Sequence, residues 1–259
     1  MSCFEDWLVS WLAYPNAEQE SGVGDYPEHA KALAEYLSSH QSAAEAAAYI
    51  TSLIDPLGDV YQQLYRLGNL FGKVVRDEKE HRVRILELLK EIQRQPSILG
   101  TNRQQLTHFG HAWSDMHRLH MHGVERWEEA TLSHEEEEGL RGYYKASAEA
   151  EAWMYLHDIM VPVEWGYETI SVVGEGRPGT DILLSWVEAW LSNAAKKLKC
   201  EVISAEVRTY FGKDGSEITA TMGEHWERWT SELAKLSKKD SGLSQEGREL
   251  AVRCYEYMR

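Results

Sequence analysis

Apolar residues recur at helical spacing along most of the chain, and six prolines fall between the segments that show this pattern. A helix with one buried face places an apolar residue at every third or fourth position. The pattern therefore predicts about nine helices: 3–13, one from about 27, one from about 43, 58–94, 103–131, 134–159, 180–199, 223–237 and 244–257.

Local signals support several of these boundaries. Asp25 precedes Pro27 as an N-cap ahead of a first-turn proline, and Ser42-Ala-Ala-Glu45 is a capping box. In the long 58–94 segment Gly68 and Gly72 are weak points. A stripe of apolar residues spaced by three follows them: Val83, Leu86, Leu89 and Ile92.

The segment 201–221 fits two structures. Glu201–Phe211 and Ser216–Met222 flank Gly212-Lys-Asp-Gly215, which suits a β-hairpin with a loop. A helix followed by a loop fits as well. We expect an all-α fold, with a single helical domain over 1–259. The short hairpin would be its only β-structure.

Composition and charge exclude several classes of protein. The chain is 43% hydrophobic and 27% charged, so it can bury a core, and its formal net charge of −15 makes nucleic acid an unlikely partner. The same charge disfavours an anionic membrane surface. We find no secretory leader, no apolar run long enough to cross a membrane and no CxxC spacing among three cysteines, so we expect a cytoplasmic protein.

The aromatic residues are unusual, with 10 Trp and 13 Tyr against 4 Phe. Rings that carry a polar atom suit a wet pocket or a partner surface better than a dry interior.

Six of the eleven histidines lie between 108 and 134. On a helix, one apolar face would carry Trp113, His117, His120 and Trp127. The polar face would carry His108, His111, Asp115 and His122, whose spacing could chelate a metal but also fits a solvated face. We treat that metal set as weak and expect no metal and no cofactor.

The next helix places Glu149, Trp153 and His157 on one face, which could meet the face of His117 and His120. The predicted site therefore has His117, His120 or His157 as the acid/base group and Glu149 as its orienter. Its substrate-binding walls are Trp113, Trp127 and Trp153. Trp226, three residues before Trp229, is a further substrate-binding candidate or a core edge.

Two motifs match known templates only in part. Glu78-x-x-His81 is half of a di-iron bundle signature, and the chain has no second Glu-x-x-His. Gly174-Glu-Gly176-Arg-Pro-Gly179 matches G-x-G-x-x-G, but the sequence before it is helical and no further strand–helix units follow. A turn between two helices is the favoured interpretation of the second motif.

The C-terminal segment Trp226-Glu-Arg-Trp229, with Leu243-Ser-Gln-Glu246 through Met258, resembles the closing pattern of a fungal family designated domain of unknown function 3632. The segments 85–96, 109–115 and 184–191 also resemble that family, and the likeness spans roughly 30–258. Lys145–Trp153 departs from it, where the family has an Asn-x-x-Ala-Phe-like run. The resemblance implies a mostly helical fungal protein and supplies no catalytic residues.

Three functions stay open at this point. The leading one is an enzyme of fungal secondary metabolism that acts on a small-molecule substrate in the His/Trp-lined pocket, with a reaction that the sequence does not identify. The second is a non-catalytic interaction or scaffold protein that uses exposed Trp and Tyr. The third is an aminoacyl-tRNA-dependent peptide-bond former, which the acidic charge disfavours. A homodimer is left open.

Overall fold

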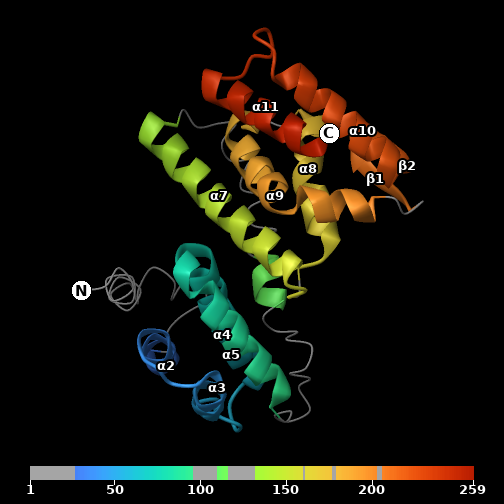
Figure 1. Ribbon diagram of the computed structural model, residues 1–259. Helices are drawn as coiled ribbons and strands as arrows, with labels where there is room; N and C mark the ends of the chain where they lie inside the picture. Colours follow the sequence, from blue (N-terminus) through green and yellow to red (C-terminus); the bar gives the residue numbers. More distant parts are fainter. Residues whose placement is uncertain (1–26, 96–109, 116–131, 160, 177–178, 203–205) are drawn as a thin grey trace. The chain divides into compact units, whose positions relative to one another are not determined.

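The computed structural model describes residues 27–95, 110–115, 132–159, 161–176, 179–202 and 206–259 (Figure 1). Helices make up most of these residues, and the sheet that they contain is one two-stranded hairpin. The all-α prediction is therefore confirmed. The chain divides into two compact units, residues 1–118 (unit 1) and 119–259 (unit 2). A single domain over 1–259 stays a prediction.

Unit 1 contains four α-helices in its described part: α2 (Pro27–Ser38), α3 (Ala43–Ser52), α4 (Val60–Asp77) and α5 (Arg82–Arg94). Residues 110–115 are also helical. α3 packs against α2 and α5, and the core between them is fully apolar at Ala47, Ile50, Ile85 and Leu88. Ser42 forms the predicted capping box with Glu45 at the start of α3.

The predicted 58–94 segment is interrupted near Glu78, at a place that neither Gly68 nor Gly72 marks. A short 3-10 helix, η2 (Lys79–His81), separates α4 from α5. The run 76–82 has no apolar side chain to bury, so packing cannot hold a continuous helix there. Instead the Arg82 guanidinium donates to the carbonyl of Val75 at 2.7 Å, which satisfies one of the last carbonyls of α4.

The predicted stripe on α5 is wrong at Val83, whose side chain is 60% exposed. Residues spaced by three fall about 60° behind at each step on an α-helix, so Val83 and Ile92 end on opposite sides. The buried face consists of Ile85, Leu86, Leu88, Leu89 and Ile92.

Unit 2 is built around one central helix. Its helices are α7 (His134–Leu156), α8 (Val163–Glu175), α9 (Thr180–Glu201), α10 (Met222–Leu236) and α11 (Gln245–Met258). α9 packs against α7, α8 and α11, as Figure 1 shows. Trp186 and Trp190 on α9 are fully buried, which explains why this helix needs neighbours on several sides.

Within the segment 201–221, residues 207–221 form a hairpin, one of the two structures that the sequence allowed. β1 (Val207–Phe211) pairs antiparallel with β2 (Glu217–Thr221), with Val207 opposite Thr221 and Phe211 opposite Glu217. Thr221 then forms a capping box with Glu224, so the end of the hairpin is also the start of α10.

Asp181 ties three helices of unit 2 together. Its Oδ2 accepts from the Arg141 guanidinium of α7 at 2.8 Å, and its Oδ1 accepts from the Ser244 hydroxyl at the start of α11 at 3.0 Å. Gly247 makes this approach sterically possible, because a Cβ there would lie 1.7 Å from the same Oδ1.

No helix in the described ranges is long and apolar enough to cross a membrane.

Candidate functional site

The predicted His/Trp pocket falls largely outside the described residues. His117, His120 and Trp127, like the metal candidates His108 and His122, belong to that outside part. Trp113 is described within unit 1, where it is 3% exposed. The joint site of these residues with α7 of unit 2 therefore stays a prediction.

The three predicted site residues on α7 lie on its more exposed side. Glu149 and Trp153 are partly exposed and His157 is exposed. The Trp153 and His157 rings contact each other with centroids 4.7 Å apart, as their shared face predicted. The face of α7 that packs within unit 2 carries Glu151 in place of Glu149.

Glu151 is a buried carboxylate that the sequence analysis missed. Its side chain is fully buried, and Oε2 accepts from the indole N–H groups of Trp190 at 2.9 Å and Trp186 at 3.3 Å. A buried carboxylate needs such donors, because burial without them would be costly. Glu149 and Glu151 lie 200° apart around the helix, so they cannot both point into the same packed face. Periodicity alone does not say which of the two does.

Trp226 lies in the wall of an open hollow on unit 2. The hollow has a volume of about 700 Å³ and lies where α10 and α11 meet the end of α9. It is lined by Lys199, Val202, Gly223, Trp226, Glu227, Thr230, Ser231, Ala234, Tyr255 and Met258. Of the predicted substrate-binding residues that the structure describes, Trp226 is the one that lines it.

Hydrogen bonds fix the wall of this hollow. The Trp226 indole N–H donates to the carbonyl of Met258 at 3.1 Å, and the side chain is 5% exposed. Lys199 donates to the carbonyl of Met258 at 3.2 Å and also to that of Arg259. An ammonium has three N–H donors, so Lys199 keeps one for a ligand. Trp226 is thus an almost fully buried part of the wall, and Lys199 carries a positive charge beside it.

The glycine-rich segment from Gly174 to Gly179 joins two helices. This is the interpretation that the sequence favoured over a dinucleotide-binding motif. Gly174 lies within α8, and Ile170–Val173 before it are helical. Gly176 ends α8 with φ 61°, and Gly179 begins α9 with φ 70°, conformations that glycine adopts without strain. Gly176 and Gly179 also line a smaller hollow of about 380 Å³.

The two described members of the weak metal set each contact a tyrosine of α4. His111 Nδ1 lies 3.2 Å from the Tyr61 hydroxyl, and Asp115 Oδ2 accepts from the Tyr65 hydroxyl at 2.8 Å. Burial and the Asp115 carboxylate raise the pKa of Tyr65 to about 12. Packing of residues 110–115 against α4 within unit 1 therefore explains the spacing of His111 and Asp115.

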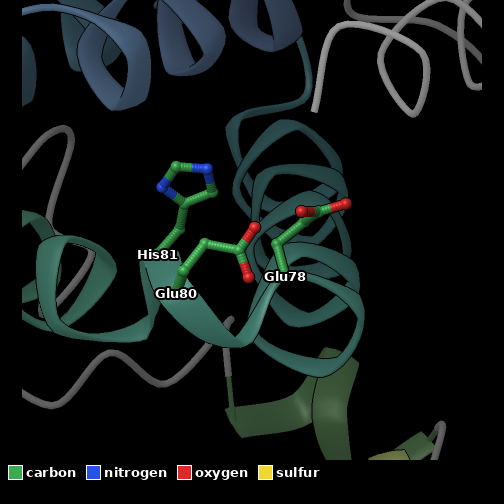
Figure 2. A group of neighbouring side chains, drawn as sticks. All are labelled: Glu78, Glu80 and His81. Carbon is green, nitrogen blue, oxygen red and sulfur yellow. The ribbon is translucent and has the colours of Figure 1, made fainter. Parts of the chain in front are cut away.

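The turn between α4 and α5 gathers Glu78, Glu80 and His81 (Figure 2). One ligand atom from each lies within 4.8 Å of the others. Glu78 is 5% exposed, while Glu80 is exposed and His81 is partly exposed. Burial and the nearby Glu80 and Asp77 carboxylates raise the pKa of Glu78, and burial lowers that of His81. Both pKa shifts favour the neutral forms of Glu78 and His81.

His225, which the sequence analysis did not select, closes the hairpin onto α10. The ring is fully buried, and Nε2 lies 3.0 Å from the Arg208 carbonyl, so Nε2 carries the hydrogen. It stacks on Trp229 at 5.6 Å and meets the edge of Tyr210 at 4.8 Å. Burial lowers the pKa of His225 in spite of the Arg208 hydrogen bond.

The lowered pKa of His225 predicts that acid destabilises unit 2. The unfolded chain takes up a proton at His225 below about pH 6.5, whereas the folded chain does so only at lower pH. Stability contributed by neutral His225 is therefore present above pH 6.5 and lost as the pH falls toward the folded pKa. We expect His225→Gln to flatten the dependence of unfolding free energy on pH between about 7 and 5. Urea unfolding at several pH values measures the slope, which His134→Gln, at an exposed position, should leave unchanged.

No protein-family model, curated protein or solved structure matches this chain. The fungal resemblance therefore stays a prediction.

Proposed function

We propose that unit 2 binds a small organic acid with a flat apolar body in the Trp226 hollow. The observation that carries this proposal is the hollow itself, because its volume of about 700 Å³ falls within the usual range for small-molecule pockets.

The lining supports this class of ligand. Val202, Ala234 and Met258 supply apolar surface, and the Trp226 side chain adds to it. The Lys199 ammonium keeps one N–H donor for an anion, and the Arg259 guanidinium lies near the Tyr255 ring, 5.6 Å from its centroid. Among the described lining residues, Lys199 supplies the positive charge and Glu227 the negative one.

The proposal concerns binding. No histidine is among the described residues that line the hollow, and His117 and His120 lie outside the described residues, so the predicted acid/base roles find no support there. An enzyme of fungal secondary metabolism, a scaffold protein and a peptide-bond former stay predictions from the sequence.

A plugged hollow tests the proposal, with 2-naphthoate as the probe. Ala234→Trp would fill the hollow from α10, and Lys235→Trp places the same ring at the next, exposed position. We expect 2-naphthoate to bind the wild type and Lys235→Trp alike, and Ala234→Trp at least about tenfold more weakly. Titration followed through the Trp226 indole resonance measures this. Equal binding by both variants, or no saturable binding by the wild type, would contradict the proposal.

The charge preference has its own test. Lys199→Gln should weaken 2-naphthoate at least about threefold and leave uncharged 2-naphthol unchanged, because only the acid uses the ammonium. Lys196→Gln removes the same charge from α9 outside the hollow and should change neither affinity. An equal loss for acid and alcohol would mean that Lys199 shapes the wall without selecting an anion.

A further inference from the structure

We propose that the acid bound in the Trp226 hollow is a zwitterion, namely an amino acid with an aromatic side chain, and that Glu227 selects it by binding its ammonium group. This inference rests on the proposed function, because it concerns the same hollow of unit 2 and names the class of acid more narrowly. Lys199 binds the carboxylate of the ligand, and the apolar part of the lining contacts its side chain.

The two opposite charges of the lining do not neutralise each other. Lys199 donates to the main-chain oxygens of Met258 and Arg259, and no ion pair joins it to Glu227 in the described part of the chain. The Glu227 carboxylate has no hydrogen bond and no ion pair with any other described residue. A hollow that presents an ammonium and a carboxylate, neither paired with the other, is complementary to a ligand that carries both charges.

α10 places Glu227 beside open space in the hollow. Gly223, Glu227 and Ser231 follow one another at intervals of four residues, so they lie on one side of the helix, and all three line the hollow. Gly223 has no side chain, and a Cβ there would meet nothing within 4 Å. The space one turn before Glu227 is therefore free for an ammonium group that pairs with its carboxylate.

A ligand with only one of the two charges fits the lining less well. A simple acid pairs with Lys199 but leaves Glu227 unpaired and brings a second negative charge near it. A simple amine leaves the remaining N–H donor of Lys199 unused. In an amino acid both groups are attached to one carbon atom, so they fit together in a single hollow. Val202, Ala234 and Met258 then favour an aromatic side chain over a polar one.

Three indole compounds test the proposal. L-tryptophan carries both charged groups, indole-3-propionate lacks the ammonium group, and tryptamine lacks the carboxylate. We expect the wild type to bind L-tryptophan at least about threefold more tightly than either of the others, because only L-tryptophan pairs with both Lys199 and Glu227. Titration of the full chain, followed through the Trp226 indole resonance, measures the three affinities.

A matched pair of variants assigns the selection to Glu227. Glu227→Gln should weaken L-tryptophan and tryptamine at least about threefold and should not weaken indole-3-propionate. Glu227 is exposed, so the variant should fold, and circular dichroism checks this. Glu256→Gln removes the same charge from an exposed position of α11 outside the lining, and it should change none of the three affinities.

The outcomes separate this proposal from the one on which it rests. The zwitterion is ruled out if indole-3-propionate binds the wild type as tightly as L-tryptophan. It is also ruled out if Glu227→Gln and Glu256→Gln have the same effect. In both cases saturable binding of 2-naphthoate would still support an acid in the hollow. If neither 2-naphthoate nor any of the indole compounds saturates the wild type, both proposals fail.

Discussion

Replacing Glu151 by leucine is expected to lower the free energy of unfolding of unit 2 by about 3 kcal/mol. Leucine has a similar volume but cannot accept a hydrogen bond, so the indole N–H groups of Trp186 and Trp190 would lose the carboxylate oxygen that they share. Each buried donor left unpaired costs about 1–3 kcal/mol. Urea unfolding followed by circular dichroism measures the loss.

Glutamine at the same position is the matched control. Its amide oxygen can accept from both indoles without a charge, so Glu151→Gln should remain within about 1 kcal/mol of the wild type. If leucine and glutamine have the same effect, hydrogen bonding to Trp186 and Trp190 is not what Glu151 contributes.

Gly247→Ala is expected to destabilise unit 2 by about 2–4 kcal/mol. The new methyl group would lie 1.7 Å from Asp181 Oδ1, so Asp181 or the start of α11 must move. Either movement weakens the Ser244 contact and strains the pairing of Asp181 with Arg141, whose side chain is only 8% exposed. Thermal unfolding of the variant measures the loss.

Gly142→Ala should change stability in the opposite direction. Gly142 is an exposed position within α7 where a Cβ would meet nothing within 4 Å. Alanine there removes backbone entropy from the unfolded chain and should stabilise by about 0.5–1 kcal/mol. A loss at Gly142 similar to that at Gly247 would show that steric contact with Asp181 is not the cause.

Much of the fold could be predicted because its signals are local. The capping box at Ser42, the restart at Ser244 and the breakers at Gly176 and Gly179 depend on residues within a few positions of each other. The break at Glu78 could not be predicted from local signals, because a run of charged residues ends a helix only where the helix has no surface to pack against.

The candidate site was harder to predict from the sequence, because it depends on which helix faces pack against each other. Trp226 could be found from its type and spacing. Glu151 could not be separated from Glu149 without knowing that Trp186 and Trp190 of α9 approach that side of α7. The spacing of Glu78 and His81 is visible in the sequence, but the burial of Glu78 depends on the turn that the structure places there.

The burial of Trp186, Trp190 and Trp229 has a spectroscopic consequence. All three are 0% exposed, and seven of the ten tryptophans fall within 119–259. Indole emission from the native chain should therefore be dominated by rings shielded from water, and its red shift on denaturation should follow mainly unit 2. Fluorescence and far-ultraviolet circular dichroism, which reports the helices of both units, would then coincide only if the two units unfold together.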